Sequence, residues 1–185
     1  MAQADFLITT ERVGLRPWLE GDIPAMAAIS GDREVMRFFP APATYKQTEE
    51  FIHRMQKSYT DRGYCYFPVF LLATKRLIGF TGLLYQTYEG LPFMPCTDVG
   101  WRLDKSVWGK GLATEAARAC LTFGFENCRL NTIYATCPQV NTPSERVMKK
   151  LGMSRQGTFM HPRLKDAPHL QPCVYYSVDK ERTRS

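Results

Sequence analysis

A chain of 185 residues, 44% of them hydrophobic, is long enough to bury one core, because single domains commonly hold about 100–200 residues. Lysine plus arginine exceed aspartate plus glutamate, 24 against 18, yet the basic residues form no run with interleaved aromatic residues. The sequence therefore argues against a second domain and against nucleic acid as a direct ligand. The positive balance fits a solvated surface that helps to attract an anionic ligand.

Cysteine and histidine usage indicates the compartment and argues against a metal. The six cysteines include no Cys-x-x-Cys pair, and several lie in apolar segments, as free thiols do in a reducing cytoplasm. The three histidines have no spacing that suits zinc, so we expect no metal. Residues 1–5 are not basic and no long apolar run follows them, so we expect a soluble, cytoplasmic protein without a membrane partner.

The first third of the chain predicts one strand and two helices. Residues 7–16 mix β-branched and apolar residues and predict a strand. In residues 22–31 an aspartate precedes Ile-Pro and a glycine follows, which is typical of a short helix with Asp22 as its N-cap. Residues 44–63 begin with Thr-x-x-Gln, a capping-box pattern, and end at a glycine. They predict a longer helix.

A hairpin and a loop follow. Residues 66–74 and 77–86 predict two strands joined at Lys-Arg, and Gly79 and Gly82 in the second indicate a bulge or a close backbone approach. Residues 87–96 contain Gly90, Pro92 and Pro95 and predict a loop of a length that often carries function. Residues 97–103 predict the next strand.

The last part of the chain alternates strands and helices. A glycine turn at 108–111 precedes a helix that begins at Leu112, and residues 131–137 predict a strand. Thr142, Pro143 and Glu145 predict an N-cap, first turn and capping box for a helix that Gly152 ends. Residues 153–159 and 173–179 predict two last strands around a loop at 161–172. The order predicts an α/β domain around a mixed sheet.

The glycine turn between strand and helix is typical of an anion-binding site, because uncapped N–H groups and the positive end of the helix dipole face the ligand. A P-loop would need a glycine five positions before Gly109, where Asp104 stands, and Ser or Thr after Lys110. A dinucleotide fingerprint would need a glycine at Thr114. Neither nucleotide motif fits, although an isolated Gly-x-Gly can also be a simple turn.

The segment Trp108-x-x-Gly111-x-Ala113 resembles the acetyl-CoA motif of the GNAT acyltransferase superfamily, with Trp in place of the usual Gln or Arg. Asn141-x-x-Ser144, followed by Val-Met-Lys-Lys-Leu-Gly-Met, is similar to a second segment of that family. Within the superfamily, the run Trp-Gly-Lys-Gly-x-Ala-Thr-Glu-Ala that starts at Trp108 resembles the ribosomal-protein N-terminal (RimJ/RimL-like) acetyltransferases. The resemblance implies one GNAT-type domain over 1–185, with a mixed, mostly antiparallel sheet flanked by helices and a splayed strand at the acetyl-CoA site.

The resemblance also implies how acetyl-CoA binds. Backbone N–H groups of Gly109 to Thr114 would hold the pyrophosphate, and the strand from Gly100 to Leu103 would pair with the pantetheine arm and offer an N–H near Trp101 to the thioester oxygen. Ordinary strand packing of these side chains is compatible with this role. The cofactor-binding residues implied are Trp101, Arg102, Leu103, Trp108, Gly109, Lys110, Gly111, Leu112, Ala113, Thr114 and Asn141.

Two catalytic residues are implied. Many GNAT enzymes use a tyrosine to protonate the thiolate, but Met148 stands at that position here, so the resemblance transfers the role to Ser144, one turn earlier. Asp98 matches an acidic position of the subgroup and would accept the proton of the amine, either directly or through water. The alternatives are that Ser144 only decorates a helix start and that Asp98 is a polar strand residue facing solvent.

The implied activity is transfer of an acetyl group from acetyl-CoA to a primary amine, by direct attack in a ternary complex without a covalent enzyme intermediate. The alternatives are a non-catalytic acyl-CoA-binding or sensing module and a different nucleotide-binding protein. The acceptor would be a peptide N-terminus or a small amine. The loops at 87–96 and 161–172 hold Glu89 and Asp166 as their carboxylates, which disfavours polycations. A homodimer is compatible with the sequence.

Overall fold

The computed structural model describes residues 6–89, 91 and 93–181. Residues 1–5, and Gly90 and Pro92 of the predicted loop, lie outside the described residues. Eight strands form one sheet in the order β1-β2-β3-β4-β5-β6-β8-β7. Their bounds are β1 Ile8–Thr9, β2 Val13–Leu15, β3 Tyr66–Leu71, β4 Leu77–Gln86, β5 Cys96–Leu103, β6 Thr132–Pro138, β7 Ser154–Met160 and β8 Pro172–Asp179. All neighbouring strands are antiparallel except β5 and β6, which are parallel.

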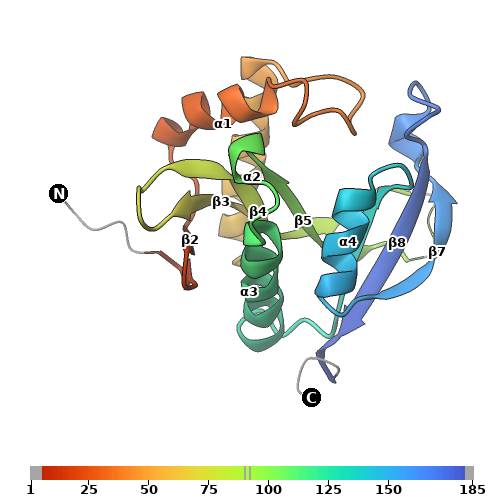
Figure 1. Cartoon of the computed structure of the whole chain (residues 1–185). Helices are drawn as coiled ribbons and strands as arrows, with labels where there is room; N and C mark the ends of the chain where they lie inside the picture. The colour runs from red at the N-terminus through yellow and green to blue at the C-terminus, as the bar shows by residue number, and fades with distance from the viewer. Residues whose placement is uncertain (1–5, 90, 92, 182–185) are drawn as a thin grey trace.

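Four α-helices cover the sheet, with bounds α1 Ile23–Ser30, α2 Tyr45–Arg62, α3 Leu112–Glu126 and α4 Thr142–Lys150. In Figure 1, α3 and α4 lie in front of the sheet and α2 lies behind it. The mixed, mostly antiparallel sheet flanked by helices confirms the predicted fold class. No helix in the described ranges is both long and apolar enough to span a membrane.

The prediction of a single strand over residues 7–16 was wrong, because these residues form the β1–β2 hairpin. Ile8 pairs with Leu15 and Thr9 with Gly14. The turn is closed by Thr10, whose backbone amide donates to the Val13 carbonyl at 2.9 Å and whose Oγ1 accepts from the Val13 amide at 3.1 Å. A polar Thr-Glu-Arg run between apolar residues was therefore a turn signal that the strand prediction missed.

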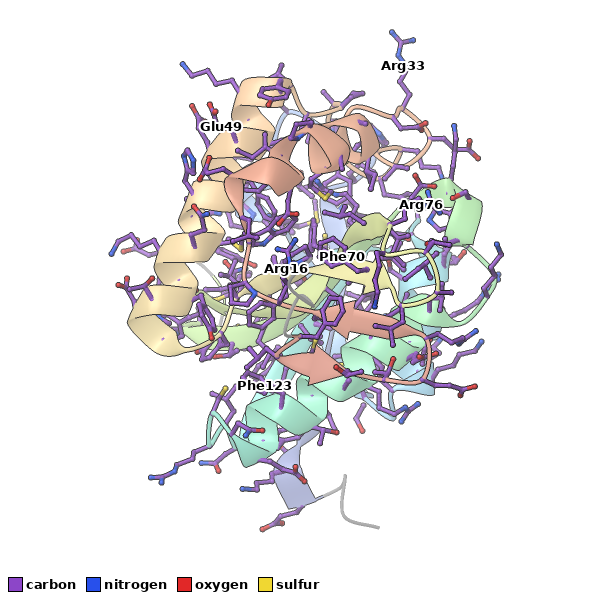
Figure 2. All side chains as sticks on the ribbon, turned by 90° about the vertical axis from the view of Figure 1, so that its left-hand side faces the viewer. Arg16, Arg33, Glu49, Phe70, Arg76 and Phe123 are labelled. Carbon is purple, nitrogen blue, oxygen red and sulfur yellow. The ribbon has the colours of Figure 1, made fainter. Side chains whose placement is uncertain are left out.

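The two predicted N-terminal helices form, with one difference at a cap. Thr44 Oγ1 accepts from the Gln47 amide and Gln47 Oε1 from the Thr44 amide, so the predicted capping box starts α2. Asp22 precedes α1 but makes no side-chain cap. Its carboxylate instead pairs with Arg16 at 2.7 Å, and the Arg16 guanidinium lies 4.4 Å from the Phe70 ring centroid (Figure 2).

The predicted close approach at the two β4 glycines is confirmed. A Cβ on Gly79 would lie 2.0 Å from the Arg102 carbonyl oxygen, and one on Gly82 would lie 2.1 Å from the Cys65 carbonyl oxygen. The φ angles of Gly79 and Gly82 are +136° and +154°, and the β3–β4 register shifts between Val69 and Phe70. At these positions the backbones of β3 and β5 leave no space for a side chain on β4, so glycine is required there.

The helix predicted from Thr142 starts one residue differently. Asn141 is the N-cap of α4, because its Oδ1 accepts from the Ser144 amide at 3.2 Å. Glu145 forms no capping box and instead accepts a hydrogen bond from the Tyr176 hydroxyl at 2.6 Å. The buried face of α4 holds Met148, which is 1% exposed and packs in a core cluster with β6 and β8.

Candidate active site

The parallel strands β5 and β6 pair at a single position, Asp98 with Tyr134, although β5 pairs with β4 along its whole length. From Val99 onwards, the edge of β5 that faces β6 has no strand partner among the described residues. This is the splay that the sequence predicted, with Gly100 just beyond the last pair. An extended ligand arm could form backbone hydrogen bonds along this edge.

The turn that precedes α3 has the geometry of an anion-binding loop. Gly109 and Gly111 have φ angles of +73° and +77°, a conformation that L side chains rarely adopt. No side chain caps α3 within the part of the chain that the structure describes, so its first amides are free for a ligand. Figure 1 shows the start of α4 at the same upper end of the molecule as the start of α3, so two helix N-termini face the same region.

Contacts from three directions hold the turn in place. Trp108 Nε1 donates to the Leu103 carbonyl at 2.8 Å, which ties the turn to the end of β5. Arg12 donates to the Lys110 carbonyl at 2.9 Å and forms an ion pair with Glu115 in the first turn of α3. Lys110 donates back to the Ser106 carbonyl at 3.0 Å. Trp108 thus has a structural role in the turn itself.

A cleft of about 830 Å³ adjoins the turn on the outer side of α3. It is lined by β1 and by α3 residues that include Gly111, Thr114 and Arg118, and Lys150 borders it. Because Gly111 belongs to the glycine turn and Thr114 to the first turn of α3, the cleft adjoins the turn directly. Arg118 and Lys150 add positive charge at its far side.

Asp98 is buried, which excludes the alternative of a solvent-facing strand residue. The Tyr66 hydroxyl donates to Asp98 Oδ1 at 2.5 Å, and Gln86 Nε2 donates to Oδ2 at 3.1 Å. Burial raises the pKa of the Asp98 carboxyl to about 6, against the two hydrogen bonds, which lower it. A carboxylate with that pKa is ionised at neutral pH yet basic enough to take up a proton.

A row of two glycines across the sheet makes room for the Tyr66 contact. Tyr66 is paired with Gly82, and Gly82 with Gly100, so the three residues lie side by side on one face. A Cβ on Gly100 would lie 2.8 Å from the Tyr66 ring. The tyrosine ring therefore lies directly over the β5 backbone, and Gly100 is required for its hydroxyl to reach Asp98.

Asp98 and Ser144 lie on opposite sides of the sheet. Asp98 shares its face with Tyr66 and Phe80, and the Phe80 ring packs against Phe51 of α2; we call this the Asp98 face. The opposite side of β4 and β5 packs against α3 and α4 through Leu83, Val99 and their neighbours. Ser144, in the first turn of α4, is half-buried, and its hydroxyl has no hydrogen-bond partner in the described residues. The structure therefore does not bring the two predicted catalytic side chains together; the splayed strands stand between them.

The two loops singled out from sequence meet on the Asp98 face. Tyr88 stacks on His161 with centroids 5.3 Å apart, and Phe93 stacks on Tyr175 at 4.4 Å. Burial and the Asp98 charge raise the pKa of Tyr88, so this ring also lies near Asp98. We call Tyr88, His161, Phe93 and Tyr175 the aromatic wall. The sequence analysis missed Tyr66, Gln86 and the aromatic wall, because these residues come together through strand register and not through a local motif.

The thiols near the site are poor nucleophiles. Burial raises the pKa of Cys96, which precedes Asp98 by two residues, to about 12, and does the same for Cys137 at the end of β6. Both thiols are therefore protonated at neutral pH. Within residues 6–89, 91 and 93–181, no three His, Cys, Asp or Glu side chains form a candidate metal site.

Comparison with known proteins identifies the class. The family model of the GNAT acetyltransferase domain matches residues 12–154, so the chain belongs to the GNAT acetyltransferase family. An uncharacterized N-acetyltransferase of Bacillus subtilis, YnaD, is 34% identical over 153 residues, which cover 82% of this chain and 85% of YnaD. GNAT acetyltransferases use acetyl-CoA.

Solved structures agree with this assignment. A GNAT-family acetyltransferase from Bacillus anthracis superposes with a TM-score of 0.78 at 31% identity and covers 94% of this chain and 98% of its own. RimL, a ribosomal L7/L12 alpha-N-protein acetyltransferase solved in complex with coenzyme A, has a TM-score of 0.76 at 16% identity, with coverage of 95% and 98%. At that identity the likeness to RimL concerns the fold alone.

Proposed function

We propose that this acetyltransferase transfers the acetyl group of acetyl-CoA to a primary amine by direct attack in a ternary complex, and that it is a member of the RimJ/RimL-like subgroup. The single observation that carries the proposal is the buried Asp98 carboxylate at the one β5–β6 pair, beyond which the two strands are unpaired. The thioester supplies the activated acetyl group when acetyl-CoA is bound. The chain would supply the base that deprotonates the amine, the surface that binds acetyl-CoA, and the proton that the leaving thiolate takes up.

On the cofactor side, the uncapped amides from Leu112 to Thr114 and the two left-handed glycines would bind the pyrophosphate. The free edge of β5, from Val99 to Leu103, would pair with the pantetheine arm and direct an N–H near Trp101 to the thioester oxygen. Asn141 Oδ1 is used by the Ser144 amide, so Asn141 would contact the ligand through its side-chain NH₂ group.

On the amine side, Asp98 would take a proton from the incoming ammonium and leave the neutral amine as the nucleophile. A peptide α-amine has a pKa near 8, so a carboxylate with a pKa of about 6 can share that proton when the two are in hydrogen-bond contact. Tyr66 and Gln86 hold both carboxylate oxygens and fix the direction of attack.

On the thiolate side, the Ser144 hydroxyl would donate the proton that the leaving sulfur needs. Its position in the first turn of α4 adds the positive end of a helix dipole, which stabilises a developing negative charge. Direct attack, without an acyl-enzyme, is supported by the raised pKa values of Cys96 and Cys137.

The proposal is tested by isothermal titration with acetyl-CoA, followed by free-thiol release in the presence of peptides, polyamines and aminoglycosides. We expect binding of acetyl-CoA and turnover with one acceptor class, and loss of turnover in Asp98→Asn with acetyl-CoA binding retained. Well-folded protein that does not bind acetyl-CoA would refute the proposal. Binding without turnover over the whole panel would favour a sensing module.

A further inference from the structure

Arg102 is a half-buried arginine that has no carboxylate partner among the described residues. Its Nη1 donates to Ser30 Oγ at 3.1 Å, whereas its Nε is fully buried and has no hydrogen-bond partner among the described residues. The ion pairs of the described residues involve other cations, including Arg12, Arg16 and Lys105. A buried donor without a partner is unfavourable by about 1–3 kcal/mol, so a folded protein rarely keeps one without a use.

The free donors of Arg102 have a defined geometry. The guanidinium lies 4.4 Å from the Phe39 ring centroid and 5.1 Å from that of Phe80, so aromatic rings flank it. Since Ser30 binds Nη1, the edge formed by Nε and Nη2 remains, and this edge would offer two parallel N–H donors once the buried Nε is uncovered. Two parallel donors match the two oxygens of a carboxylate.

Arg102 lies on the Asp98 face, four residues after Asp98 on the same strand. Four residues of extended strand span about 13 Å between Cα atoms. The Phe80 ring connects the two sites, because it stacks on Tyr66 at 5.3 Å and also contacts Arg102. The base and the free guanidinium edge are therefore two points of one surface, separated by a distance on the order of 10 Å.

The other charges on this face agree with an anionic ligand. Among the described residues, the buried carboxylates are Asp98 and Asp22, and Asp22 is paired with Arg16. Arg163 lies over the Tyr88 ring at 4.7 Å and adds a second cation beside the aromatic wall. A polycationic amine would meet two guanidinium groups there and a single buried carboxylate, Asp98, with Glu89 and Asp166 at exposed positions of the two loops.

We propose that the acceptor is a primary amine that carries a carboxylate about 10 Å away, and that Arg102 binds this carboxylate through its Nε–Nη2 edge while Asp98 receives the amine. A peptide whose second or third residue is acidic has this spacing, because each extended residue spans about 3.3–3.6 Å. A free α-amino acid is too short. Phe39, which is 40% exposed, would move aside to admit the carboxylate. The inference rests on the proposed acetyl transfer to an amine.

The test uses amidated hexapeptides that differ only at positions two and three, with Glu-Glu, Gln-Gln or Lys-Lys, together with glutamate and spermidine. Thiol release with the wild type should favour Glu-Glu over Gln-Gln by about tenfold or more in kcat/KM. Arg102→Gln should abolish this preference, mainly through KM, and Arg102→Lys should restore part of it. Arg33→Gln is the matched control, because it removes the same charge at an exposed position that points away from the molecule (Figure 2).

A binding measurement separates this inference from the proposed function. The N-acetylated Glu-Glu and Gln-Gln peptides are titrated into the CoA complexes of the wild type and of Arg102→Gln, with thermal unfolding as the check on folding. Charge-dependent binding that Arg102→Gln abolishes would support the Arg102 site even if no acceptor were acetylated. Turnover that ignores peptide charge, a preference that survives in Arg102→Gln, or a preference for spermidine or free glutamate would overturn it and leave acetyl transfer standing.

Discussion

Replacing Tyr66 by phenylalanine removes one hydroxyl and leaves the ring over Gly100 and against Phe80 in place. The lost contact is the 2.5 Å hydrogen bond to Asp98 Oδ1, which holds the pKa of Asp98 down. Hydrogen bonds to charged groups contribute about 1.5–3 kcal/mol, and one pKa unit corresponds to about 1.4 kcal/mol. The pKa of Asp98 should therefore rise by about 1–2 units in Tyr66→Phe.

The sign follows from the role of Asp98. The ionised form is the base, so kcat/KM should rise with pH through the pKa of Asp98, near 6 in the wild type. In Tyr66→Phe this acid limb should move to about pH 7–8, with a several-fold loss at pH 6.5 and convergence of the two enzymes at alkaline pH.

The assay is thiol release over a range of pH with one acceptor, at acceptor concentrations well below KM. Tyr64→Phe is the matched control, because it removes a neighbouring buried hydroxyl that bonds Thr97 at 3.1 Å and does not touch Asp98. Its acid limb should coincide with that of the wild type. An acid limb of Tyr66→Phe that stays in place, or moves to lower pH, would contradict the assignment of Asp98 as the base.

Three further predictions concern stability, proton donation and the glycine turn. The pKa of Asp98 is about 6 in the folded protein and near 4 in the unfolded chain, so the free energy of unfolding rises as pH falls through this window. At pH 8 the ionised carboxylate lowers the free energy of unfolding by about 3 kcal/mol. Asp98→Asn should therefore raise Tm by several degrees at pH 8 and far less at pH 4, and equal Tm shifts at the two pH values would disprove the linkage. Ser144→Ala should lower kcat about tenfold and leave the KM for acetyl-CoA unchanged. The control is Thr142→Ala, at a neighbouring exposed position, which should have the kinetics of the wild type. If the two variants have equal kcat values, Ser144 has no part in the mechanism. Gly111→Ala places an L residue at φ +77° and should weaken acetyl-CoA binding in titration. Gly63→Ala, at φ +78° in the C-cap of α2, should lower the free energy of unfolding by a similar amount, about 1 kcal/mol, and keep the affinity for acetyl-CoA. Equal affinities of the two variants would argue against acetyl-CoA binding at the glycine turn.

The features predicted well from sequence are those encoded locally. The Thr44–Gln47 capping box and the glycine turn before Leu112 depend on a few adjacent residues, and the structure shows both. Local signals also mislead by one position when two residues compete for one role. Asn141 and Thr142 can both cap a helix, and Asn141 takes the role because its Oδ1 reaches the Ser144 amide.

The surroundings of Asp98 could not be predicted, because they depend on register across three strands. Tyr66 is 32 positions away in the chain and meets Asp98 because the residues next to it in the strand register, Gly82 of β4 and Gly100 of β5, have no side chain. The buried Nε of Arg102, which has no hydrogen-bond partner in the part of the chain that the structure describes, is equally invisible in sequence, because any strand arginine looks the same until its neighbours are placed. The role of each of these residues in catalysis stays a prediction.

The single pairing of Asp98 with Tyr134 has a mechanical consequence. The sheet is divided there into two half-sheets, β1 to β5 and β6 to β8, and the proposed base occupies the hinge between them. A ligand arm lying along β5 would act as a temporary extra strand and stiffen the hinge, and its departure would release it. Separation of the two halves would then displace the Asp98 backbone, so departure of the arm would be coupled to the position of the proposed base.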